Sequence, residues 1–399
     1  MIKRWRGVLS HPYATRLVLT NLAVRVSAGA VVLSLVLFLE DARGSFAAAG
    51  AVAGAYGIGT ALGSPPIGRL IDRHGQTWTL IGSALLHGLA LLLVVAVPTA
   101  PLAVLSALGA VAGAARPAVP ACVRSLWIEL LTDEADRRAS YRLESVVLEL
   151  GFILGPVFAG GLVAVLPAAW PVVSSALIAV VATLVFAATP PSRAWRGTGH
   201  AERGLTGPLR SPALLSLLTS RAALGVTIGA VQVGAAAAAT AGGRSGVSGV
   251  LLGGFALGSL IGGTLLVVPR DALALTRSYL VFSLAMAAGL VPLLIPAQLW
   301  VLVALFAVAG LSMAPLNAAA YEITDLTAPP GTGTEARIWT STATAGGTAL
   351  GSAAAGPLVD AAVPRTAFLL ALAGALLAAV IAVATRSLLR DRVAGTLVR

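Results

Sequence analysis

Five ionisable side chains lie well inside long apolar stretches of this sequence. They are Arg25, Arg116, Arg221, Glu149 and His87. A charged group in hydrocarbon is costly and normally faces a partner or a water-filled cavity. If the three arginines share a cavity with the single glutamate, that cavity keeps a positive excess even after pairing. Such a site would suit a small ligand that carries a carboxylate or another anionic group.

Each of these side chains also has a second interpretation. Arg116 and Glu149 either form a static ion pair, or Glu149 exchanges protons, because a carboxylic acid holds its proton more tightly in apolar surroundings than beside an arginine. Arg25 and Arg221 either contact a ligand, or donate to helix carbonyls and extend toward the membrane surface. We expect His87 to have a hydrogen-bonded packing role.

Neutral polar side chains in the same stretches, Asn21, Gln232 and Asn317, could bind a ligand or bond neighbouring helices. The sequence holds no nucleotide-binding loop, no metal-spaced Cys/His cluster and no nucleophile motif. We therefore expect no enzyme activity, no cofactor and no metal. The lone Cys122 permits no intramolecular disulfide.

The composition indicates which elements position these residues. The 399 residues are 57% hydrophobic and 11% charged, with a mean hydropathy of +0.91, whereas soluble domains are about 25% charged. Apolar runs recur at about 20 residues, the length that crosses a bilayer. We predict an all-α membrane protein with twelve spans, over residues 16–39, 46–67, 78–97, 102–125, 142–166, 170–189, 213–239, 247–268, 277–295, 300–321, 334–360 and 366–386.

Basic residues are distributed unequally between the two predicted sides of the membrane. Of the 27, 21 fall on the side of the N-terminus, and the opposite loops hold only Arg43, Arg244 and Arg365. The positive-inside rule then places both termini in the cytoplasm and makes the number of crossings even. We expect the protein to lie in a bacterial-type inner membrane. The net charge of +11 is explained in this way without nucleic acid. We expect a monomer surrounded by lipid.

The chain divides into two halves of six spans. The polar segment 190–212 predicts a cytoplasmic linker between an N-terminal bundle, 1–189, and a C-terminal bundle with a short tail, 213–399. Three stretches match at an offset of about 200 residues: SAGAV with TIGAV, YGIGTALG with FALGSLIG, and GFILGPVFAG with GTALGSAAAG, which begin at Ser27 and Thr227, Tyr56 and Phe255, and Gly151 and Gly347. Parallel repeats of this kind surround a central site in two-lobed transporters.

Glycines in both halves recur four residues apart, which allows helix backbones to approach closely. They either serve general helix packing or form a sliding seam between the two bundles.

Two motifs resemble those of a known family. GRLIDRHG, from Gly68 to Gly75, resembles the G-x-L-x-D-R-x-G signature of the major facilitator superfamily. GFILGPVFAG resembles the G-x-x-x-G-P-x-x-G-G motif of that family's twelve-span drug:proton antiporters, with Ala159 at one glycine position. Arg116 is similar to the buried arginine of their fourth helix. The resemblance covers essentially the whole chain.

This resemblance implies roles for both motifs. Gly68, Arg69, Asp72, Arg73 and Gly75 would form a cytoplasmic latch, in which Asp72 meets Arg124 and the start of span eleven. The alternative is a simple charged turn. Gln76 and Thr77 stand where the family usually has basic residues. The second motif would be a gating element, through Gly151, Gly155, Pro156 and Gly160.

The resemblance also implies a function. We expect a secondary transporter that works by alternating access and exports small organic molecules or drugs, driven by protons. Many drug antiporters have an acid in span one, where this chain has Arg25, and Glu149 is the proton-coupling candidate. The alternatives are an importer or facilitator of an organic anion, and a non-transporting membrane sensor with the same fold.

Overall fold

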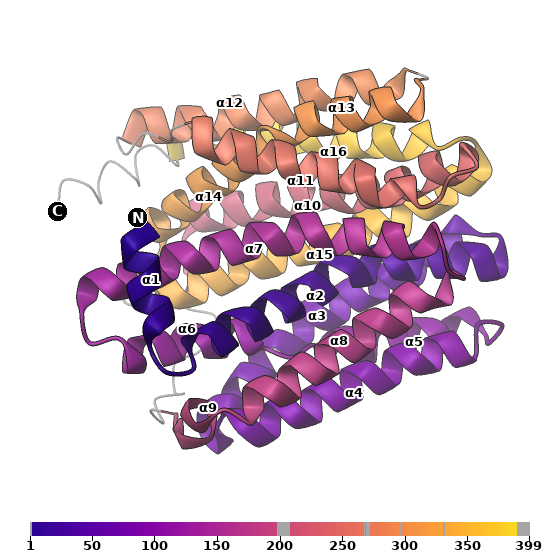
Figure 1. Ribbon diagram of the computed structural model, residues 1–399. Helices are drawn as coiled ribbons and strands as arrows, with labels where there is room; N and C mark the ends of the chain where they lie inside the picture. The colour runs from indigo at the N-terminus through magenta and orange to yellow at the C-terminus, as the bar shows by residue number, and fades with distance from the viewer. Residues whose placement is uncertain are drawn as a thin grey trace.

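The computed structural model describes residues 2–197, 208–266, 268, 272–295, 297–329 and 332–388, which form helices and connecting segments without a strand. Parts of the predicted linker, 198–207, and tail, 389–399, lie outside these residues. The first half contains α1 (Ile2–Ser10), α2 (Ala14–Arg43), α3 (Phe46–His74), α4 (Gln76–Ala96), α5 (Leu102–Ala114), α6 (Val119–Leu130), α7 (Glu134–Val163), α8 (Ala169–Ala187) and α9 (Pro190–Ala194) (Figure 1). The second contains α10 (Pro212–Ala241), α11 (Val247–Leu265), α12 (Ala272–Leu290), α13 (Leu299–Gly310), α14 (Met313–Thr327), α15 (Gly333–Ala361) and α16 (Arg365–Ala384), with 3-10 turns at Pro208–Arg210 and Val291–Leu294.

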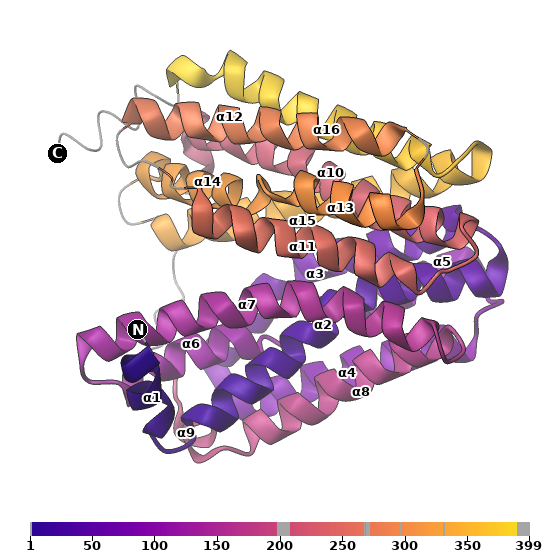
Figure 2. The same ribbon diagram turned by 45° about the horizontal axis from the view of Figure 1, so that its top comes forward.

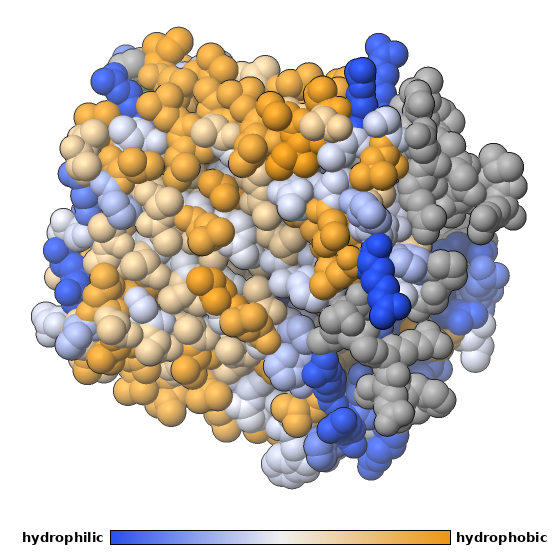
Figure 3. Space-filling view, turned by 180° about the vertical axis from the view of Figure 1, so that it is seen from behind, coloured by the Kyte–Doolittle hydropathy of each residue, from blue (hydrophilic) through white to orange (hydrophobic). Residues whose placement is uncertain are grey.

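Two six-helix bundles lie side by side. The first lobe comprises α2 to α8, counting α5 and α6 as one interrupted span, and the second comprises α10 to α16, with α13 and α14 as another. Figure 2 shows the second lobe above the first, with α7 and α11 at their boundary. On the face shown in Figure 3, apolar residues cover much of the surface between the two ends, and the most hydrophilic residues gather toward the ends, as lipid exposure requires.

Eleven of the described helices, with each interrupted span counted once, are long and apolar enough to cross a membrane. The predicted eleventh span, α15, is as long as the others but contains many Thr, Ser, Gly and Ala residues. It packs along α3, α10 and α16. Its neighbours therefore cover much of the surface that lipid would otherwise contact, and α15 completes the twelve predicted crossings.

The two ends of the bundle differ. The linker end holds α1, α9 and the turns at Gly75 and 131–133, and the distal end holds the turns at Gly44, 97–101, 164–168 and 242–246. In Figure 1 the linker end lies to the left. The positive-inside rule favours a cytoplasmic location for the linker end.

Several predicted spans differ from the structure, and α3, for example, continues to His74 instead of ending at 67. Span five begins at Glu134 instead of 142, because Asp133 caps the helix by accepting from the Ala135 N–H and acidic residues fill its first turn. Span four breaks between Ala114 and Val119. Pro117 in the break lacks the N–H that would continue the helix. The tenth span breaks at the corresponding place, between Gly310 and Met313.

The same contacts recur in the two lobes. Ser27 donates to the Ser175 carbonyl at 2.7 Å, and Thr227 donates to the Ala371 carbonyl at 2.9 Å. Close contacts of glycines also recur. In the first lobe Gly59 packs against Ala110, Gly113 against Tyr56 and Gly151 against Arg25, and in the second lobe the matching contacts are Gly258 against Ala307, Gly310 against Phe255 and Gly347 against Ala222. Tyr56 with Phe255 and Gly151 with Gly347 keep the register of the sequence matches, whereas Arg25 and Ala222 are three residues out of the register of Ser27 and Thr227. The repeat therefore extends to tertiary packing, with a local shift between α2 and α10.

The hydrophobic core is shared at one end of the molecule and divided at the other. A single cluster joins both lobes in the distal half, from Leu35 and Val52 to Val233 and Phe368. In the linker half, separate clusters fill the first lobe, around Trp127, and the second, around Tyr279. The two lobes therefore share one hydrophobic core at the distal end, and each has its own core at the linker end.

Candidate functional site

A cavity of about 580 Å³ lies in the linker half of the first lobe. Helices α2, α3, α6 and α7 and the break in span four form its wall. Charged, polar and aromatic side chains that line it include Arg25, Ser64, Asp72, Arg116, Phe152 and Trp195. It extends from the level of Gly29 and Gly151 to Asp72 at the linker end. The cavity thus combines apolar walls with two arginines, an arrangement suited to an amphiphilic small molecule.

The broken span four positions Arg116. Its backbone N–H bonds the Gly113 carbonyl at 3.1 Å, and Pro117 follows before α6 begins. The side chain is exposed on the cavity wall. Within the described ranges it makes no hydrogen bond and no ion pair. The two prolines of RPAVP were the sequence signal for this break, which the prediction of one continuous span missed.

Arg25 is fixed by its own helix and by α7. Its Nε donates to the Asn21 side-chain oxygen at 3.1 Å. A Cβ atom at Gly151 would lie 2.7 Å from the Cβ of Arg25, so only glycine allows α7 to pack this closely. Asn21 is buried and acts on Arg25 from within the helix. Arg25 and Arg116 therefore share one cavity.

The glycine-proline motif of α7 has two faces. Gly151 and Gly155 pack on α2 inside the first lobe. Pro156 and Gly160 meet Gly249 of α11 in the second lobe, where a Cβ at Gly249 would lie 2.2 Å from the Pro156 carbonyl oxygen. The motif therefore joins the cavity wall to the contact between lobes.

Glu149 does not pair with Arg116. The two described ion pairs are Arg138 with Glu134 and Arg337 with Asp325, so the expected Arg116–Glu149 pair is absent from this conformation. Glu149 is half-buried and lies two residues from Gly151, or about 200° around the helix. It is one turn from Ile153, whose carbonyl approaches Gly253 of α11. Glu149 thus lies on the side of α7 that faces the second lobe.

Glu144 is an acid of α7 that faces Arg25, one of the two arginines of the cavity. It interacts electrostatically with Arg124 and Arg25. The sequence interpretation that made Glu149 the only deep acid was wrong, because it began span five too late. Glu144 is seven residues before Gly151, which places both residues on one face of α7. That spacing was the available signal.

The predicted latch is not assembled in this conformation. Asp72 is exposed at the cavity mouth, and among the described residues its side chain makes no hydrogen bond or ion pair. Arg69 and Arg73 are also exposed, while Arg124 lies over the Tyr141 ring at 5.0 Å from its centre. Gly75 has φ +84, a conformation that favours glycine in the turn, whereas Gly68 has no close neighbour.

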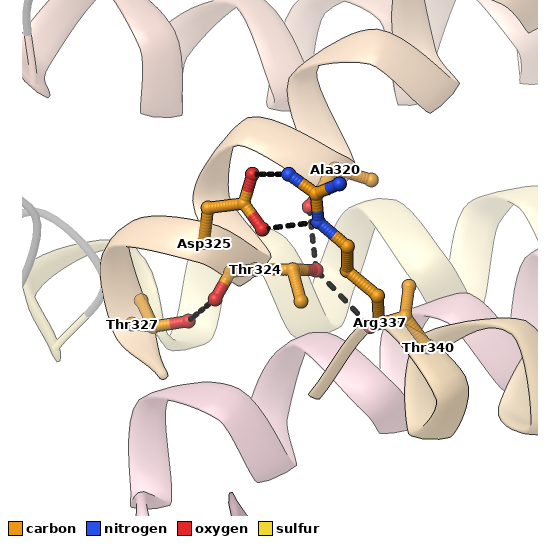
Figure 4. A network of polar contacts seen from close by, with 6 residues as sticks. All are labelled: Ala320, Thr324, Asp325, Thr327, Arg337 and Thr340. Atoms are coloured by element: carbon orange, nitrogen blue, oxygen red, sulfur yellow. Dashed lines mark hydrogen bonds and ion pairs between the residues drawn. The ribbon is translucent and has the colours of Figure 1, made fainter. Parts of the chain in front are cut away.

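The start of α15 is held within the second lobe. Arg337 donates to Asp325 of α14 through Nε at 2.6 Å and also through Nη2. Thr324 and Thr340 bond beside this pair at 3.0 Å (Figure 4). These contacts fix the end of the helix that Asp72 would approach if the linker end closed.

The other candidates lie outside the cavity. Arg221 is buried and its Nε donates to Thr344 at 3.1 Å, while its Nη1 has no hydrogen-bond partner in the described part of the chain. Its burial excludes extension to the membrane surface in this conformation. The side-chain oxygens of Gln232 and Asn317 are likewise buried without a described partner. His87 bonds the Ala112 carbonyl at 2.7 Å, which confirms its packing role.

Comparisons with known proteins agree with this architecture. No curated protein matches the sequence. Among solved structures, a mutant of the nucleoside transporter NupG has a TM-score of 0.76 and 13% identity, over 93% of this chain and 98% of that one. A bacterial homologue of the human lysosomal transporter Spinster gives 0.65 and 14%, over 97% and 98%. A POT family peptide transporter gives 0.67 and 15%, over 94% and 96%.

These structures share the fold, and two of their names specify different molecules, nucleosides and peptides, so they do not single out the drug:proton antiporters. The sequence itself matches the family described as Major Facilitator Superfamily over residues 17–270. With twelve crossings in two related lobes and a cavity in the first lobe, the chain belongs to the Major Facilitator Superfamily of membrane transporters.

Proposed function

We propose that this protein is a secondary transporter that works by alternating access. The observation that carries this proposal is the core that both lobes share in the distal half and that separates in the linker half. A molecule bound in the cavity would be accessible from the linker side of the membrane. Rocking of the lobes would close that side and open the distal side, which is a rigid-body transition of packed elements.

The proposed cargo is a small organic molecule with an anionic group. Arg116 on the cavity wall and Arg221 in the second lobe each have no acidic partner among the described residues. Arg25 faces Glu144, so it is partly compensated. An unpaired guanidinium matches a carboxylate through two parallel hydrogen bonds. Phe152, Leu148 and Ile67 supply apolar contacts to the rest of the molecule.

The proposed direction is export driven by protons, with the linker end in the cytoplasm. Support comes from the basic residues at that end and from the resemblance of the α7 motif to the antiporters. Glu149 is the proposed proton-coupling group because it lies where α7 turns toward the second lobe. Its surroundings would change as the lobes rock, and with them its affinity for a proton.

Three probes of similar size test the cargo class: benzoate, benzamide and benzylamine. We expect benzoate alone to raise the melting temperature of the protein in nanodiscs. At a benzoate concentration a hundred times its dissociation constant, binding should add about 2.7 kcal/mol to the free energy of unfolding. Arg116→Gln should weaken benzoate binding by about 1.5–3 kcal/mol. Arg365→Gln, which removes an exposed arginine at the distal end, is the matched control.

Flux of radiolabelled benzoate in proteoliposomes then separates a carrier from a sensor. Counterflow that depends on Arg116 supports the proposal. Binding without flux would contradict transport and favour the sensor, and equal binding by Arg116→Gln would contradict the assigned site. Accumulation inside right-side-out vesicles against a proton gradient would contradict export.

A further inference from the structure

A carboxylate at the distal end bridges the two lobes. Asp360, next to the last residue of α15, lies at the start of α3. Its Oδ1 accepts from the Phe46 N–H at 2.9 Å, and its Oδ2 accepts from the Ala47 N–H at 2.9 Å and from the Ser45 hydroxyl at 2.8 Å. The second lobe therefore supplies the anion that satisfies the first N–H groups of a helix in the first lobe.

The physical basis is the free end of α3. The first N–H groups of a helix have no partner within it, and the helix dipole favours negative charge there. Ser45 Oγ accepts from the Ala48 N–H at 3.2 Å and satisfies one of these groups. Asp360 satisfies two of the others, so three bonds depend on one carboxylate.

Asp360 and Asp72 lie at opposite ends of the packed pair of helices α3 and α15. Helices α3 and α15 pack against each other and each has 29 residues. Asp72 is two residues from the end of α3, beside the linker end where α15 starts, and Asp360 is one residue from the end of α15, beside the start of α3. In this conformation Asp360 is fully engaged, and Asp72 has no described hydrogen bond or ion pair.

We propose that Asp360 is a distal latch, reciprocal to Asp72, that holds the distal side closed. This inference rests on the proposed alternating access. When the lobes rock, the α15 carboxylate leaves α3 and the α3 carboxylate reaches the start of α15, so only one latch is closed at a time. Glu40 of α2 interacts electrostatically with Asp360. This like charge favours departure of Asp360 once its bonds to α3 break.

Close glycine contacts beside the latch allow it to form. A Cβ at Gly50 would lie 2.3 Å from the Ser352 carbonyl oxygen, and one at Gly356 would lie 2.2 Å from the Phe46 carbonyl oxygen. The backbones of α3 and α15 therefore touch about one turn and about two turns from Asp360. A single carboxylate can span the lobes only at this separation.

Distances between spin labels test the latch. One pair, at the exposed Thr99 and Arg244, reports on the distal side, and another, at Glu129 and Arg210, reports on the linker side, all in a Cys122→Ala background. We expect Asp360→Asn to raise the distal-open population by about tenfold, as loss of charge-assisted hydrogen bonds predicts. Ser45→Ala should act in the same direction but more weakly.

Asp72→Asn is the matched control, because it should lower the distal-open population and should partly cancel Asp360→Asn in the double variant. Melting temperatures verify that each variant is folded. Unchanged distal distances in Asp360→Asn, with two populations in the wild-type protein, would overturn the latch and leave alternating access intact. One identical population in the wild-type protein and in every variant, together with no flux, would overturn both.

Discussion

Glu144 and Glu149 show how one helix directs two similar residues to different parts of the molecule. Glu144 shares a face of α7 with Gly151 and meets the arginines of the first lobe. Glu149, five residues later, faces the second lobe. The helical period of 3.6 residues separates them by about 140° around the axis. Glu144 thus belongs to the site that we propose for the cargo, and Glu149 to the boundary that moves.

This difference predicts unlike effects of two conservative substitutions. Glu149→Gln should make transport insensitive to an imposed proton gradient, because the amide cannot exchange a proton. Glu144→Gln should retain the response to the gradient and change the affinity for benzoate, since it removes the negative charge that faces Arg25. Uptake by proteoliposomes with and without a gradient measures both effects. A full gradient response in Glu149→Gln would remove this residue from the mechanism.

At the scale of the helices, the recurring glycines have two separate uses. One set lets spans pack within a lobe and comprises Gly59, Gly63, Gly258 and Gly262. The other set lies at contacts between lobes, where Gly50 of α3 packs against α15 and Gly249 of α11 packs against α7. Glycines therefore lie both at packing contacts within a lobe and at contacts between lobes, and sliding along the second set stays a prediction. The sequence spacing alone does not separate them, because it fixes the face of one helix without identifying its neighbour.

Alanine substitutions should separate the two uses. Gly59→Ala puts a Cβ 2.0 Å from the Ala110 carbonyl oxygen inside the first lobe, so it should lower stability by about 1–3 kcal/mol. Gly50→Ala should widen the distal spin-label distance with a smaller loss of stability, because the lobes can part. Gly82→Ala, where a Cβ meets nothing within 4 Å, is the control. Thermal unfolding and label distances measure these effects, and equal behaviour of Gly59→Ala and Gly50→Ala would contradict the distinction.

At the scale of the whole molecule, charge and core packing describe the same asymmetry. The linker end holds most basic residues and is the end where the two lobes have separate cores. The distal end has the shared core and the Asp360 contact. If the positive-inside rule applies, the cavity of this conformation opens to the cytoplasm.

Cysteine labelling in intact cells tests the orientation. In a Cys122→Ala background, Arg193→Cys and Arg386→Cys should resist a membrane-impermeant maleimide until the cells are permeabilised. Arg244→Cys and Arg365→Cys, at the distal end, should react at once. Reaction of Arg193→Cys and Arg386→Cys from opposite sides would contradict an even number of crossings in the second lobe.

The sequence by itself determined the features that depend on composition and period. Apolar length predicts the crossings, the glycine and small-residue spacing preserves the repeat, and GRLIDRHG marks the turn at Gly75. Even α15, with its many Thr, Ser, Gly and Ala residues, was predicted from the recurring apolar runs, and its match to span five supports it. These features are local, because hydrocarbon thickness and helix geometry constrain each segment separately.

The tertiary structure alone decided which charges meet and which end of the molecule is closed. The partner of Arg116 or Glu149 depends on how far each helix is rotated and on where Pro117 breaks its span, and a few residues of boundary error change both. Asp360 looks like an ordinary polar residue at a helix end until α15 is packed on α3 of the other lobe. Contacts between lobes join residues about 300 positions apart, and their closure depends on the relative position of two bodies, which no local pattern encodes.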